Sequence, residues 1–122
     1  MNHTRFTFIR DDRGQPVGCI AYRVNGGKFE YEVSTHNPKD EFDRKLARKV
    51  AEGRLDKHPM LISFDPLIPP SLPQLLRSAA FDLVSEPALL PEGRVIPGRL
   101  VRALEAHLKQ EENVSNEETK HS

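Results

Sequence analysis

Basic side chains gather in one short stretch, DEFDRKLARKVAEGRL, which runs from Asp40 to Leu55. The residues in it that could contact phosphate or carboxylate groups are Arg44, Lys45, Arg48, Lys49 and Arg54. In a helix, the first four would lie opposite Phe42 and Leu46 and form one charged face. Such a face can bind an acidic protein or nucleic-acid phosphates, or it can face solvent with its charges paired one turn away.

Acidic residues near this face favour a protein partner. Glu41 and Glu52 fall within the same arc of the helix, whereas nucleic-acid surfaces are usually more purely basic and often carry stacking aromatic rings. The open face of the predicted sheet would also show Glu30 and Glu32, which repel phosphate. We therefore predict a non-enzymatic binding protein, with nucleic-acid binding through the same basic residues as the alternative.

A third possibility is an enzyme built on a histidine and two carboxylates. His36, Asp40 and Asp43 lie close together in sequence near a predicted helix start and could hold a cation. Acidic residues at a helix N-terminus also complement the helix dipole, which explains them without a metal. We expect no metal site and no cofactor, since the chain also lacks a glycine-rich phosphate loop that opens a helix.

Two further groups have the residue types for catalysis but not the expected surroundings. Asp11 and Asp12 fall in a predicted turn that is exposed to water. In water the two carboxyl groups would have similar pKa values, so neither would serve as the acid while the other serves as the base. Cys19 is predicted in the middle of a strand opposite Glu32, and a neighbouring carboxylate raises the pKa of a thiol. Both groups therefore favour a structural explanation.

Alternating apolar residues predict three antiparallel strands, Arg5–Arg10, Val17–Val24 and Lys28–Val33. The last two are joined by Asn25-Gly26, a pair typical of two-residue hairpin turns. This turn would set Tyr22 opposite Phe29 and leave the larger apolar side chains on one face, whereas a shift of one residue would mix the two faces.

The basic stretch belongs to a predicted helix, Asn37–Glu52, that packs on this apolar face. Asn37 is a suitable N-cap, and Gly53 is typical of a helix end. We expect Phe6 and Phe8 of the first strand to extend the apolar face of the sheet. The side chains expected to cover that face are Phe42, Leu46 and Val50.

The second half of the chain adds two more helices, predicted over Ser71–Val84 and Gly98–Glu112. Between them and the first helix, Met60–Phe64 could form an edge strand or an extended crossing segment, because prolines bracket it. The predicted fold is α+β: a three-stranded antiparallel meander packed by a helix and followed by two helices. We expect one domain over residues 1–112 and a disordered acidic tail over residues 113–122.

Composition limits the environment of the protein. The formal net charge is zero, so no overall field attracts the chain to nucleic acid or membranes. The single cysteine fits a reducing compartment, and neither an apolar run of about 18 residues nor a signal-peptide pattern is present. We expect a cytoplasmic location and no membrane contact, and the oligomeric state stays open.

The stretch from Asp40 to Leu55, with the STHNPK segment before it, resembles small uncharacterised phage-encoded accessory proteins. These share the pattern D-x-F-x-R-K-x-x-R-x-x-A-x-G-R-L, which is matched here, although Ala47 stands where they often have glycine. The resemblance covers about residues 31–55 and implies a phage or prophage factor that engages a host protein. It implies no activity and no site residues.

Overall fold

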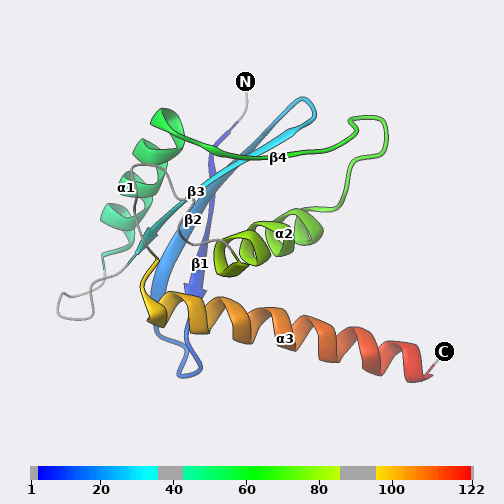
Figure 1. The fold of residues 1–122 in the computed structure, drawn as a ribbon. Coiled ribbons are helices and arrows are strands. Elements are labelled where there is room, and N and C mark those ends of the chain that lie inside the picture. Colours follow the sequence, from blue (N-terminus) through cyan, green and yellow to red (C-terminus); the bar gives the residue numbers. More distant parts are fainter. Residues whose placement is uncertain (1–2, 36–42, 86–95, 122) are drawn as a thin grey trace.

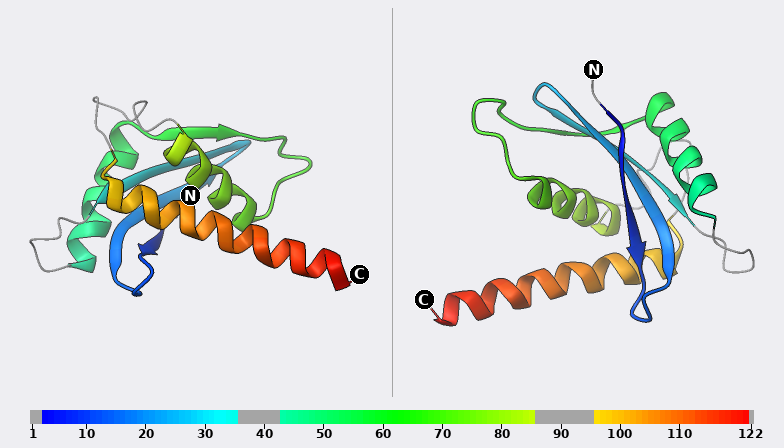
Figure 2. Two further views of the ribbon diagram at one scale, coloured as in Figure 1. Left: turned by 60° about the horizontal axis from the view of Figure 1, so that its bottom comes forward. Right: turned by 180° about the vertical axis from the view of Figure 1, so that it is seen from behind.

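The computed structural model describes residues 3–35, 43–85 and 96–121. Its elements are β1 (Arg5–Arg10), β2 (Pro16–Asn25), β3 (Lys28–Thr35), α1 (Arg44–Lys57), β4 (Met60–Ser63), α2 (Leu72–Ser85) and α3 (Gly98–His121). The strands form one antiparallel sheet in the order β1-β2-β3-β4. Helix α1 covers one face of this sheet, and α2 and α3 lie together on the other (Figure 1). The same two-sided arrangement is visible from behind in Figure 2. The predicted α+β class is confirmed.

The hairpin of β2 and β3 has a different register from the predicted one. Asn25 pairs with Lys28, so the turn begins at Gly26, one position later than expected. This register sets Arg23 opposite Glu30, with Nε and Oε1 3.3 Å apart. In the predicted register Arg23 would face Lys28, and like charges directly opposite each other destabilise a strand pair.

The shift of two residues leaves the faces of the hairpin as predicted, because side chains alternate with a period of two. Tyr22 now pairs with Tyr31 instead of Phe29, yet all three rings still lie on one face. Phe29 is completely buried between them, with its ring centroid 5.6 Å from that of Tyr22 and 5.9 Å from that of Tyr31. This face is covered by leucines of α2 and α3, namely Leu75, Leu83, Leu100 and Leu104.

The prediction that α1 packs on the aromatic face is wrong. The helix lies on the opposite face, where Ala51 and Leu55 pack against Cys19 and Ala21 of β2. The small side chains of that face allow a close approach by the helix, which turns Ala47 and Ala51 toward it. Leu46, expected in the core, is 58% exposed.

The prediction for the two phenylalanines of β1 is also wrong. Phe6 pairs with Ala21 and Phe8 with Cys19, so both rings lie on the α1 face and pack against its small core. Ile9, one position further along, is the β1 residue buried on the aromatic side.

Helix α1 begins and ends later than predicted. Its N-cap is Asp43, whose carboxylate accepts hydrogen bonds from the backbone N–H groups of Lys45 and Leu46. The expected N-cap Asn37 and the expected core residue Phe42 lie outside the described residues. The helix runs through Gly53 to Lys57, so the predicted end at Gly53 is wrong; a Cβ at that exposed glycine would meet nothing within 4 Å.

The second half of the chain follows the prediction more closely. Residues 60–63 join the sheet as its fourth strand and pair with β3 at the edge. The predicted start of α2 is confirmed by a capping box, in which Ser71 N–H donates to Gln74 Oε1 at 2.9 Å and Gln74 N–H to Ser71 Oγ at 3.4 Å. Helix α3 continues to His121, beyond the predicted end at Glu112. The division into a domain of residues 1–112 and a tail of residues 113–122 stays a prediction.

Candidate functional site: the basic face of α1 and the edge of β1

Helix α1 is fixed on the sheet at several points along its length. Ser34 Oγ donates a hydrogen bond to the backbone oxygen of Ala47 at 2.9 Å. Near the other end, Arg23 Nη1 lies 2.9 Å from Asp56 Oδ1, and this contact is the main reason why the pKa of the Arg23 guanidinium is raised. These contacts fix which face of α1 points away from the sheet.

Four of the five predicted binding residues are exposed on α1, two of them beside its buried side. Arg44, Lys45, Arg48 and Lys49 are all exposed, and we call these four residues the basic patch. Two of them rest on aromatic rings of β1, since the guanidinium carbon of Arg44 lies 5.7 Å from the Phe8 ring centroid and that of Arg48 lies 6.0 Å from the Phe6 ring centroid. The two lysines extend from the helix beside them.

The fifth predicted residue, Arg54, belongs to the packing of α1 instead. Its Nη1 donates a hydrogen bond to the backbone oxygen of Val33 in β3 at 2.8 Å, and its side chain is half-buried. The later end of α1 explains this position, because Arg54 lies within the helix and on the side that faces β3.

Phe6 and Phe8 are site residues that the sequence analysis missed. Both are apolar residues in a strand that also carries Ile9, so alternation alone left two possible faces for each side chain. The choice between them depends on the connection to β2, where the register shifts between Ile9 and Arg10. This irregularity is produced by the turn Asp11–Gln15 and has no clear signature in the strand itself.

Asp11, one of the two carboxylates of that turn, has the structural role that was predicted for the pair. Asp11 Oδ1 accepts hydrogen bonds from the backbone N–H groups of Arg13 and Gln15, both at 2.9 Å. The hydrogen bond from Gln15 is the main reason why the pKa of Asp11 is lowered. Asp12 is exposed beside it.

The other candidate chemical groups that the structure describes, Cys19 and Asp43, are not assembled into a reactive site. Cys19 is completely buried under α1, and this burial raises the pKa of its thiol to about 11, which opposes nucleophilic chemistry. Its cross-strand neighbour is Ser34, not Glu32 as predicted. Asp43 caps α1, whereas His36 and Asp40 lie outside the described residues. Among the residues that the structure does describe, no three potential ligands are grouped to hold a metal ion.

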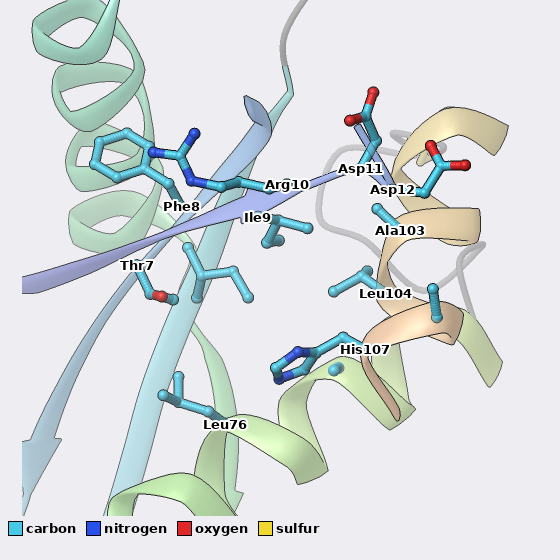
Figure 3. Close-up of a pocket in the computed structure, with 13 residues that line it drawn as sticks. Thr7, Phe8, Ile9, Arg10, Asp11, Asp12, Leu76, Ala103, Leu104 and His107 are labelled. Carbon is cyan, nitrogen blue, oxygen red and sulfur yellow. The ribbon is translucent and has the colours of Figure 1, made fainter. Parts of the chain in front are cut away.

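A groove of about 380 Å³ runs along β1 on the side opposite the basic patch. One wall is the strand itself from Thr7 onward, and the other walls come from α2 and α3. Figure 3 shows Ile9 pointing across this space toward α3, while Phe8 lies on the α1 side of the strand. The apolar side chains that line the groove are Ile9, Ile20, Leu76, Ala80, Ala103 and Leu104.

Comparison of the chain with known proteins found no relative. The chain matched no protein-family model, no curated protein and no solved structure. Its class is therefore defined by the fold alone, as an α+β protein with helices on both faces of a four-stranded antiparallel sheet. Within the ranges that the structure describes, no helix has the length and apolar character needed to cross a membrane.

Proposed function

We propose that the protein is a non-enzymatic binding protein whose basic patch engages an acidic surface of a partner protein. The observation that supports this proposal best is the placement of Arg44 and Arg48 over the rings of Phe8 and Phe6. A guanidinium that rests on a ring is already partly ordered, so it loses less conformational entropy when it binds a carboxylate. Its planar set of N–H donors also suits a two-pronged contact with a carboxylate.

Nucleic-acid binding through the same residues is the second candidate, and one observation favours it. Glu30 and Glu32, which were expected to repel phosphate from an open face, are buried beneath α1. Against it, the rings of Phe6 and Phe8 are covered by arginines, so a base could stack on them only after displacing a guanidinium. We therefore keep a protein partner as the leading proposal.

The biological setting rests on weaker support. The resemblance of residues 31–55 to phage-encoded accessory proteins implies a host protein as the partner, and this part of the proposal rests on that resemblance alone. A cytoplasmic location is proposed because Cys19 is the single cysteine and has no partner for an intrachain disulfide, which fits a reducing compartment.

The proposal predicts that reversing two charges weakens binding to an acidic polypeptide. A short fluorescent poly-glutamate probe should bind the variant Arg44→Glu/Arg48→Glu at least about tenfold more weakly than it binds the unmodified protein. Fluorescence anisotropy measures both affinities. Lys28→Glu/Lys109→Glu changes the net charge equally at two exposed positions outside the patch, so it should retain most of the affinity.

The same titration separates the two candidate functions. Fluorescent single-stranded and duplex DNA should bind more weakly than poly-glutamate, and with a shallow dependence on salt. If instead DNA binds more tightly and its affinity falls by orders of magnitude between about 50 and 200 mM salt, the second candidate is correct. Equal loss of poly-glutamate binding in both double variants would show that overall charge, not the basic patch, governs the contact.

A further inference from the structure

Strand β1 forms an open edge of the sheet. It pairs with β2 on one side only, and no other strand in the described part of the chain pairs with its outer side. The backbone N–H and C=O groups on the outer side of an edge strand can accept a further strand. The opposite edge is less suitable, because β4 has only four residues, Met60–Ser63, whereas β1 has six.

The two sides of this edge differ in chemistry. On the side of α2 and α3, the edge borders the groove, whose walls are largely apolar and which Asp11, Asp12 and His107 also line (Figure 3). On the side of α1, it borders the two Arg–Phe pairs. Arg10 is exposed at the end of this edge, where its Nη1 donates a hydrogen bond to the backbone oxygen of Gly14 at 2.9 Å. A strand added to β1 would therefore meet apolar walls with one set of side chains and arginines with the other.

We propose that the outer edge of β1 binds an extended peptide in which acidic and apolar residues alternate. Successive side chains of a strand point to opposite sides, so alternate positions would reach the arginines and the groove. Backbone hydrogen bonds to β1 would provide affinity, and the two sets of side chains would provide specificity. This inference rests on the proposed function, since the acidic positions use Arg44 and Arg48 of the basic patch.

The size of the groove fits this occupant. Its volume of about 380 Å³ lies near the lower end of the range of about 300–1,000 Å³ that is typical of small-ligand sites, and consecutive residues from Thr7 to Asp12 line it. Small side chains, Ala80 and Ala103, form part of its walls and leave room for aliphatic side chains. Ala106 lies at its mouth on α3 and is exposed.

The test uses a fluorescent peptide of alternating glutamate and valine, as long as the six residues of β1. It should bind at least about tenfold more tightly than a peptide of the same composition with its glutamates and valines in two separate blocks. Two further versions carry N-methyl groups on alternate amides, one in each of the two possible frames. Because only one side of an added strand pairs with β1, one methylated version should lose binding and the other should retain it.

Protein variants locate the peptide. Ala106→Phe narrows the mouth of the groove and should weaken binding of the alternating peptide, whereas Ser78→Phe, at an exposed position of α2 outside the groove lining, should not. Circular dichroism of both variants checks that the fold is retained. If Ala106→Phe unfolds the protein, the pair of methylated peptides still decides the question.

Several results would overturn the inference. Equal binding of the two methylated versions would mean that side chains alone make the contact, and the inference of strand addition would be wrong. The proposed function would still be supported if Arg44→Glu/Arg48→Glu loses binding to poly-glutamate. A second result is peptide binding that depends on the methylation frame and is unchanged in Arg44→Glu/Arg48→Glu. That result would contradict both the preference for acidic peptide residues and the proposed function of the basic patch. A third result would assign the surface to nucleic acid: single-stranded DNA displaces the peptide, binds more tightly than the peptide does, and binds Ala106→Phe as well as the unmodified protein.

Discussion

Replacing Leu55 by alanine should lower the free energy of unfolding by about 2–5 kcal/mol, because the side chain is completely buried and its loss leaves a cavity under α1. The same replacement at Leu46, nine residues earlier in the same helix, should change stability by no more than about 0.5 kcal/mol, since this side chain is 58% exposed. Urea unfolding followed by circular dichroism measures both effects.

This pair of substitutions decides how α1 is rotated on the sheet. The two residues have the same chemistry and lie in one helix, so helix propensity cancels and only burial differs. A large loss for Leu46→Ala and a small one for Leu55→Ala would support the rotation that the sequence predicts. Arg44 and Arg48 would then point away from the sheet and lose their contacts with Phe8 and Phe6, and the proposed binding surface would be wrong.

Replacing Phe29 by alanine should be at least as costly, about 3–5 kcal/mol, because the ring is fully buried in the aromatic face. It contacts the rings of Tyr22 and Tyr31 at centroid distances of 5.6 and 5.9 Å, and these contacts would also be lost. Phe81 on α2 is 60% exposed, so Phe81→Ala should have a small effect. The same urea titration measures both variants.

The result for Phe29 tests whether α2 and α3 cover the aromatic face. If Phe29→Ala and Phe81→Ala cost similar amounts, that face is not sealed by the two C-terminal helices. The groove beside β1 would then lack the walls supplied by Leu76 and Leu104, and the peptide site would lose its apolar side.

The hairpin shows how far the sequence could predict the sheet. Alternation of apolar residues identified the shared face of Tyr22, Phe29 and Tyr31 correctly, because this pattern is local to each strand. The pairing itself depends on whether the turn begins at Asn25 or at Gly26, and both Asn25-Gly26 and Gly26-Gly27 satisfy general turn preferences. The opposite charges of Arg23 and Glu30 favour the observed register, and this signal was present in the sequence.

The packing of α1 could not be predicted from its apolar pattern. Two stripes of the helix are suitable for burial: one with Leu46 and one with Ala51 and Leu55. The choice depends on residues distant in sequence, because the Cys19 and Ala21 face is flat enough for an alanine-rich stripe. The predicted start at Asn37 made the first stripe look continuous, whereas Asp43 caps the observed helix.

The candidate site was therefore predicted only in part. Arg44 and Arg48 were identified as exposed basic residues of one helix, since local helical periodicity is enough to place them together. Their contacts with Phe8 and Phe6 join segments that are far apart in the chain, and only the fold brings them together. The assignment of Arg54 depended on the end of the helix, the feature that sequence patterns locate least well.

The most direct test of the proposed binding surface is a two-dimensional amide NMR titration of the protein with the poly-glutamate probe. The largest shift changes should fall on the α1 segment from Arg44 to Lys49 and on β1 from Phe6 to Arg10. Changes concentrated instead on α3, or on the exposed pair Leu67 and Ile68 after β4, would show that acidic partners bind elsewhere and would contradict the proposed surface.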